Sequence, residues 1–154
     1  MNQEFSIRRY ISTLYRYGNS HIAKRLEFLN IGSGYSILLT LYRQGGISQE
    51  ELSAILKIDK GTTAKATKKL EDEGYLSREI DVNDRRAYNV FLTAKGLEVI
   101  PKIQSAIKEW EKIITSGFSE KEIYLAAEIL YKMAENASKF KVEDEGKENE
   151  ITGL

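Results

Sequence analysis

Residues 46–96 have the sequence GISQEELSAILKIDKGTTAKATKKLEDEGYLSREIDVNDRRAYNVFLTAKG, and this stretch decides the fold. Near its start, Ser48 stands three residues before Glu51, which is the spacing of a capping box at the beginning of a helix. We therefore predict that a helix begins at Gln49. Three apolar residues at helical spacing give this helix a stripe that packs inward: Leu52, Ile55 and Leu56.

A second helix is predicted from Lys60 to about Glu73. Asp59 is a good N-cap for it, and Gly74 can adopt the left-handed conformation that ends a helix. Helical spacing separates a small, largely apolar inner face from an outer face of threonine and lysine. The inner face has Thr63, Ala66, Thr67 and Leu70, and the outer face has Thr62, Lys65, Lys68 and Lys69.

A hairpin is predicted next, with strands over 75–80 and 87–93 joined by the polar turn DVNDRR. Both strands are rich in aromatic and β-branched residues, and their core side is assigned to Leu76, Ile80, Val90 and Leu92. Arg78 has the same parity as Leu76, so we expect it to be ion-paired if it is buried. The nearest candidates for its partner are Asp81 and Asp84.

Two helices at this spacing, followed by a hairpin with an arginine tip, describe a winged helix, whose second helix can lie in a DNA major groove. The stretch resembles the winged-helix core of the MarR family of bacterial and archaeal transcription regulators. The most specific part of the resemblance is an Asp-x-Arg wing followed at fixed spacing by Leu-Thr-x-x-Gly. The matching segments are 47–52, 59–63, 70–75, 84–86, 92–93 and Gly96. With less sequence signal, the resemblance extends over most of the chain.

The composition limits the number of domains, the kinds of site and the classes of protein that the chain could represent. The chain of 154 residues fits one domain, or one domain that completes its core in a partner. The absence of cysteine excludes disulfides and thiolate metal sites, and His21, the single histidine, cannot build a metal site alone. We find no phosphate loop and no catalytic constellation, so neither an enzyme nor a cofactor is expected. Without a leader pattern or a long apolar run, a cytoplasmic protein with no membrane partner is expected.

The formal net charge is zero, with 23 basic and 23 acidic residues, whereas DNA-binding domains usually have a basic excess. The charges are nevertheless separated along the chain, because the second predicted helix and the wing are basic. Five acidic residues lie in the C-terminal segment: Glu143, Asp144, Glu145, Glu148 and Glu150. A duplex would meet the local charge and not the total.

The flanking segments read as amphipathic helices. One covers 5–29, where Gly18 and Asn19 make a bend or two shorter helices as plausible as one rod. A helix from Gly34 to Arg43, capped by Ser33, should be well buried.

After the wing, Thr93 caps a long helix that Gly117 ends, and Pro101 should kink it near 98–100. A second capping box, Ser119 with Glu122, begins another helix.

The fold class expected is mainly α with a small β-hairpin wing. Residues 1–140 form one domain, in which 34–93 are the winged helix-turn-helix and 5–30 and 94–140 are dimerisation helices. From 141 to 154 a charged, disordered tail is expected. Packing both ends of the chain against a second copy buries the apolar stripes, which favours a homodimer, as the resemblance also implies. The stripes alone would equally permit a closed monomeric bundle.

The resemblance implies a regulator that binds double-stranded DNA, and we expect a repressor of a pseudo-palindromic operator. In this reading Thr62, Lys65 and Lys69 reach base edges or phosphates, and Gly61 lets backbone amides approach a phosphate. Arg86 enters the minor groove, Asp84 orients it, and Arg85 meets phosphate. The predicted DNA contacts are Lys60, Gly61, Thr62, Thr63, Lys65, Lys68, Lys69, Asp84, Arg85 and Arg86. The alternative for both elements is an ordinary solvated surface.

The resemblance also implies a small aromatic effector, often anionic, that releases the DNA. Candidate contacts are Tyr10, Tyr15, Tyr17, Tyr35, Tyr42 and Trp110, although each aromatic side chain is also a candidate for the core. Two alternatives stay open. One is a DNA-binding protein without a ligand, and the other is a winged helix that binds proteins, which the neutral charge favours.

Overall fold

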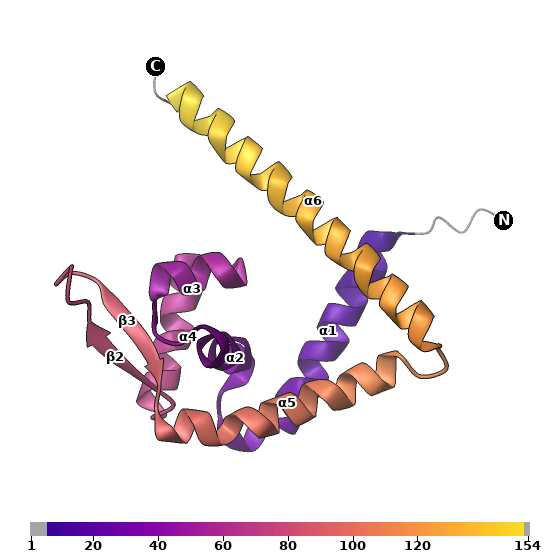
Figure 1. Cartoon of the computed structure of the whole chain (residues 1–154), viewed down its shortest axis with the longest axis horizontal. Helices are drawn as coiled ribbons and strands as arrows, with labels where there is room; N and C mark the ends of the chain where they lie inside the picture. The colour runs from indigo at the N-terminus through magenta and orange to yellow at the C-terminus, as the bar shows by residue number, and fades with distance from the viewer. Residues whose placement is uncertain (1–5, 153–154) are drawn as a thin grey trace. The chain divides into compact units, whose positions relative to one another are not determined.

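The computed structural model describes the backbone of residues 6–152 and the side chains of residues 6–141. The chain divides into two compact units, Met1–Lys112 and Ile113–Leu154. Within the described part, every helix is too short or too polar to cross a bilayer. Helices dominate, and the only sheet described is small, so the predicted fold class is confirmed (Figure 1).

The first helix, α1 (Ile7–Arg25), runs through Gly18 without a break, so the alternative of two shorter helices is wrong. Its glycine serves close packing. A Cβ built on Gly18 would lie 2.9 Å from the indole Nε1 of Trp110, which belongs to α5 (Ala94–Ile114). Glycine at this position therefore lets the α1 backbone approach the Trp110 ring.

Two short 3₁₀ turns, η1 (Glu27–Leu29) and η2 (Gly32–Gly34), lead into α2 (Tyr35–Gln44). The expected cap was wrong, because Gly34 occupies the N-cap position and no side chain caps the helix. Ser33 instead accepts a hydrogen bond from the Ser36 hydroxyl through its backbone carbonyl, at 3.3 Å. The inner face of α2 buries Ile37, Leu38 and Leu41, whereas Tyr42 is exposed.

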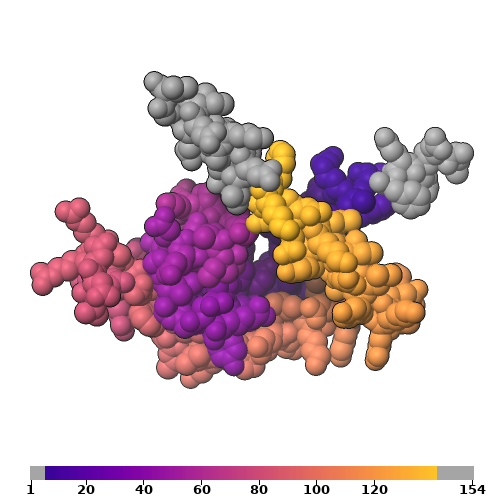
Figure 2. All heavy atoms as spheres, turned by 45° about the horizontal axis from the view of Figure 1, so that its top comes forward, coloured from indigo at the N-terminus to yellow at the C-terminus, as the bar shows by residue number. Residues whose placement is uncertain are grey.

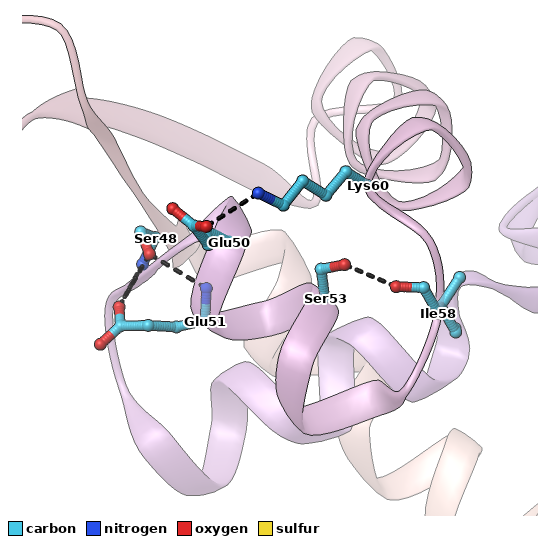
Figure 3. Close-up of polar contacts among 6 residues, drawn as sticks. All are labelled: Ser48, Glu50, Glu51, Ser53, Ile58 and Lys60. Carbon is cyan, nitrogen blue, oxygen red and sulfur yellow. Dashed lines mark hydrogen bonds and ion pairs between the residues drawn. The ribbon is translucent and has the colours of Figure 1, made fainter. Parts of the chain in front are cut away.

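The helix-turn-helix consists of α3 (Gln49–Leu56) and α4 (Lys60–Asp72). The predicted capping box is present, with Ser48 Oγ accepting from the Glu51 amide and Glu51 Oε2 accepting from the Ser48 amide (Figure 3). In the turn, Lys57 is left-handed with φ of 56°. Buried Ser53 donates to the Ile58 carbonyl at 2.5 Å, which fixes the exit from α3.

The sheet has three antiparallel strands in the order β1-β3-β2, namely β1 (Ile47–Ser48), β2 (Leu76–Ile80) and β3 (Tyr88–Leu92). The hairpin was predicted, but β1 was not, because two residues are too few to show alternation. Leu76 and Val90 are buried as expected. Ile80 is 59% exposed, contrary to expectation, because it pairs with Tyr88 at the end of the hairpin next to the turn.

Arg78 is ion-paired, but neither expected aspartate is its partner. Its Nε lies 3.0 Å from Oε2 of Glu71, and both side chains are partly buried. Glu71 lies in the last turn of α4, which packs against β2. A residue on the helix that packs against β2 can reach the middle of this strand more readily than Asp81 and Asp84, which lie in the turn after the strand.

The helix α5 continues through Pro101, and Thr93 caps it by accepting from the Gly96 amide at 3.1 Å. The kink expected from Pro101 stays a prediction. In the second unit, the capping box of Ser119 and Glu122 begins α6 (Glu120–Thr152). This helix includes residues 141–152, for which disorder was expected. Lysine and glutamate favour helix, and extending a formed helix needs no new nucleus; residues 153–154 lie outside the described part.

The core is built on side chains that are almost completely buried: Leu38, Leu52, Leu70, Val90 and Ile103. Other apolar side chains are exposed along the helices at the two ends of the chain. On α1 these are Ile7, Tyr10, Ile11 and Leu14, and on α6 they are Tyr124, Leu125, Ile129, Leu130, Tyr131 and Phe140. Each helix therefore presents an uncovered apolar surface in the single chain.

Candidate nucleic-acid interface

The outer face of α4 presents Thr62, Lys65 and Lys69, all exposed as predicted. Thr63, included among the predicted DNA contacts, is only 2% exposed, and its hydroxyl donates to the Asp59 carbonyl at 3.0 Å. One helical turn later, Thr67 is also buried. Thr63 therefore belongs to the core, because helical spacing places it on the face that packs inward.

The beginning of α4 is closed by a carboxylate. Asp59 Oδ1 accepts a hydrogen bond from the Thr62 amide at 2.9 Å. Hydrogen bonds from the Thr62 side chain and then its amide lower the pKa of Asp59. Gly61 is exposed at this end, where backbone amides are expected to approach a phosphate, but the neighbouring amide of Thr62 already has a partner.

The exposed lysines of α4 differ in their partners. Lys60 Nζ lies 2.8 Å from Glu50 Oε1, and Lys68 Nζ lies 2.6 Å from Asp72 Oδ1. The hydrogen bond from Lys60 lowers the pKa of Glu50, and the hydrogen bond to Asp72 raises the pKa of Lys68. Within residues 6–141, Lys65 and Lys69 form no ion pair, so their charges face solvent. A surface groove on α4 is lined by Ala64, Lys65, Lys68, Lys69, Asp72 and Glu73.

The wing turn is organised by Asp81. Its Oδ1 accepts from the amides of Asn83 at 2.7 Å and Asp84 at 3.3 Å, and its Oδ2 accepts from Asn89 Nδ2 at 3.3 Å. Sequence reasoning offered Asp81 only as a partner for Arg78. The signal that was missed is the aspartate at the start of a polar turn, which commonly bonds the backbone two residues on.

Asp84 does not orient Arg86 in the way that was expected. Its Oδ1 accepts from the backbone amide of Arg86 at 2.9 Å, which shapes the turn and leaves the guanidinium free of that carboxylate. The side chains of Arg85 and Arg86 are exposed and form no ion pair with any side chain in residues 6–141. In Figures 1 and 2 the hairpin projects beyond the helices of its lobe.

The Leu-Thr-x-x-Gly motif joins the wing to the end of α4. The Thr93 hydroxyl donates to the Gly74 carbonyl at 2.6 Å, and the Thr93 amide donates to the Tyr75 carbonyl at 3.1 Å. A Cβ on Gly96 would lie 2.3 Å from that same Tyr75 oxygen. Lys95 adds a hydrogen bond to the Glu73 carbonyl. These contacts hold the end of α4 and the wing together.

The six aromatic residues proposed as effector contacts differ in their environments. Tyr10, Tyr15, Tyr17 and Tyr42 are exposed. The Tyr35 hydroxyl donates to Asn19 Oδ1 at 2.8 Å, and Trp110 lies beside the His21 ring with centroids 5.7 Å apart. A groove of about 470 Å³ between α1, η1 and α5 contains none of the six, and is lined by Arg25, Leu26, Phe28, Pro101, Lys102, Ser105, Ala106 and Glu109.

Comparison with known proteins tests the resemblance. The sequence model of the MarR family matches residues 33–88. A crystal structure of a MarR transcriptional regulator from Methanosarcina mazei Go1 is 47% identical, with a TM-score of 0.82, over 87% of this chain and 97% of that one. The chain belongs to the MarR family.

Two further similar proteins are transcription regulators by name. An uncharacterized HTH-type transcriptional regulator of Bacillus subtilis (strain 168), YybA, is 30% identical over 66% of this chain and 68% of its own length. A putative MarR family regulator from Listeria monocytogenes, solved in complex with a 26mer DNA, is 32% identical with a TM-score of 0.80, over 85% and 88% of the two chains. This MarR-family protein is therefore a DNA-binding transcription regulator with a winged helix-turn-helix.

The wing of this MarR-family regulator should lose order in acid. Hydrogen bonds from the amides of Asn83 and Asp84 and from Asn89 lower the pKa of Asp81. A lowered pKa in the folded state stabilises the turn above the ordinary aspartate pKa of about 3.9, and this contribution disappears as the pH falls through the folded value. We expect the protection factors of the Asn83 and Asp84 amides, which correct for the intrinsic pH dependence of exchange, to be constant from pH 7 to about 5 and to fall below about 4.

The matched control for this acid effect is Asp81→Asn, which keeps an acceptor oxygen but cannot ionise. In that variant, the protection factors of the two amides should no longer fall in acid. An acid-dependent loss of protection that persists in Asp81→Asn would show that another group controls the turn.

Proposed function

We propose that this MarR-family regulator acts as a homodimer on a pseudo-palindromic operator, with α4 of each protomer in successive major grooves and Arg86 of each wing in the adjacent minor groove. The observation that carries the proposal is the pattern of exposed positive charge on α4 and on the wing, which the Leu-Thr-x-x-Gly motif joins. Lys65 and Lys69 on α4 and Arg85 and Arg86 on the wing are exposed cations without ion pairs in residues 6–141. Such groups can exchange water for phosphate without breaking an existing bond.

The homodimer is supported by the exposed apolar side chains of α1 and α6. Tyr10, Ile11 and Leu14 on α1 and Tyr124 and Leu125 on α6 are each more than two-fifths exposed. Burying apolar surface stabilises a complex by roughly 25 cal/mol per Å². Packing both helices against a second copy of the chain would therefore be strongly favourable. Two-fold symmetry would then set two recognition helices about 34 Å apart.

If the operator overlaps a promoter, a dimer bound there blocks transcription, and the protein acts as a repressor. Its place of action would be the cytoplasm. A small aromatic anion would act as the releasing effector. The groove between α1 and α5 offers it the exposed ring of Phe28 with Lys102 Nζ 5.4 Å from the ring centroid. Release requires that the effector favour a dimer whose helices misfit the duplex, since only a difference in affinity shifts two states.

Selection from a pool of random duplexes tests the operator. Sequencing of the bound fraction should give an inverted repeat with half-sites about one helical turn apart. A motif without two-fold symmetry would overturn the homodimeric reading. Binding without any motif would favour the alternative in which the winged helix binds proteins.

The effector needs a separate experiment. Thermal-shift titration with phenolic acids should raise the melting temperature of the free protein, and the same compounds should weaken binding to the selected duplex. A protein that responds to none of them in either assay is a regulator without such a ligand.

A further inference from the structure

We infer that Glu50 and Asp72 limit the affinity of this regulator for DNA, by holding two of the α4 lysines in ion pairs that a phosphate must break. The inference rests on the DNA-binding face proposed above and concerns how strongly that face attracts a duplex.

The first pair bridges the two helices of the helix-turn-helix. Lys60 at the start of α4 reaches back to Glu50 in the first turn of α3, with 2.8 Å between Nζ and Oε1 (Figure 3). Both side chains are about three-quarters exposed, at 77% and 76%. An exposed pair of this kind is weak, so a phosphate can replace the carboxylate.

The second pair lies one turn apart on α4 itself. Lys68 and Asp72 are at the i, i+4 spacing, 2.6 Å apart and more than half exposed. Their arrangement repeats that of the first pair, in that an exposed carboxylate occupies a lysine on the face that meets DNA. Lys65 and Lys69 form no ion pair in the described side chains, which makes them the internal comparison.

The position of Glu50 explains why its charge should matter. In a helix-turn-helix bound to DNA, the first helix crosses the backbone and the N-terminal residues of the second contact base edges. Glu50 and Lys60 lie at the beginnings of these two helices. An approaching phosphate therefore meets a carboxylate as well as the lysine, and it must displace the first to bind the second.

Another reading gives Glu50 a direct role, because a glutamate can accept a hydrogen bond from the amino group of cytosine. The two readings predict opposite effects of neutralisation. If Glu50 opposes phosphate, Glu50→Gln strengthens binding to all duplexes. If it reads a base, the same variant loses affinity for the operator and not for random DNA.

The experiment measures Kd for the selected operator and for a random duplex at several salt concentrations. We expect Glu50→Gln and Asp72→Asn each to strengthen binding to both duplexes by about three- to fivefold per protomer. The slope of log K against log salt should stay the same, because in the unaltered protein a phosphate already displaces each carboxylate and contacts the same lysine. Unchanged or weaker binding to both duplexes would overturn the inference, and so would a slope that is steeper by about 0.9 per protomer, since the carboxylates would then exclude phosphate and not be displaced by it.

Two further variants separate the effect of the pair from that of net charge. Glu98→Gln changes the charge by the same amount on α5, where Glu98 is exposed and forms no ion pair in residues 6–141, and should leave the affinity unchanged. In a Lys60→Gln background, Glu50→Gln should no longer strengthen binding. If the unaltered protein binds no duplex, the proposed function fails; if it binds and Glu50→Gln has no effect, only this inference fails.

Discussion

Gly96→Ala is expected to destabilise the protein by about 1–3 kcal/mol, because a new Cβ would lie 2.3 Å from the Tyr75 carbonyl oxygen. That oxygen is fixed on backbone and also accepts the Thr93 amide, so it cannot move aside as a flexible side chain would. For a protein of this size the melting temperature should fall by roughly 3–10 °C. The shift is measured by thermal unfolding followed by circular dichroism.

Gly61→Ala is the matched control, since it adds the same methyl group to a helix. The atom nearest to the new methyl group would be Oδ1 of Asp59, at 3.3 Å. This oxygen lies at the end of a side chain that can adjust. Alanine also favours helix over glycine, so the melting temperature should stay the same or rise slightly. Equal losses in both variants would mean that the contact with Tyr75 is not what requires Gly96.

Arg86→Ala is expected to weaken operator binding by about 1–3 kcal/mol per wing, roughly five- to 150-fold, while the fold stays intact. The fold should not change, because only the backbone amide of Arg86 bonds within the turn, to Asp84, and alanine keeps that amide. Fluorescence anisotropy with a labelled operator measures the loss. Circular dichroism checks that the melting temperature is unchanged.

Arg85→Ala provides the comparison within the same turn. Arg85 is equally exposed and is expected to meet phosphate, so its loss should be smaller and the same for every sequence. Arg86→Ala should cost most on operators with an A·T-rich tract at the wing, where the narrow minor groove attracts arginine. Unchanged affinity in Arg86→Ala would remove the wing from the mechanism.

Local sequence signals predicted several features of both units correctly. The capping boxes at Ser48 and Ser119 and the N-cap at Asp59 depend on residues three positions apart, so their hydrogen bonds can be inferred from spacing alone. The hairpin follows from its β-branched and aromatic strands. These features require no knowledge of what packs against them.

Several of the errors concern contacts between separate elements of the fold. Arg78 pairs with Glu71 across the packing of α4 on β2, and Gly18 lies against Trp110 on α5. Spacing along the chain cannot identify such partners, because the tertiary fold brings them together. The same holds for β1, which is a strand only because β3 pairs with it.

The candidate site was predicted less completely than the fold. Periodicity placed Lys65 and Lys69 on the outer face, and they are exposed. It could not indicate that Lys60 and Lys68 are ion-paired, because the rotamers of long side chains decide this. The role of Asp81 in the wing was available in the sequence as an Asx-turn signal and was overlooked.

The most direct test of the DNA-binding face is the salt dependence of operator binding by the double variant Lys65→Gln/Lys69→Gln, compared with the unaltered protein. Each lysine that binds a phosphate contributes about 0.9 to the slope of log K against log salt. If both do so, the slope should decrease by roughly 1.8 per protomer, with a large loss of affinity at low salt. An unchanged slope and affinity would contradict the assignment of α4 as the recognition helix.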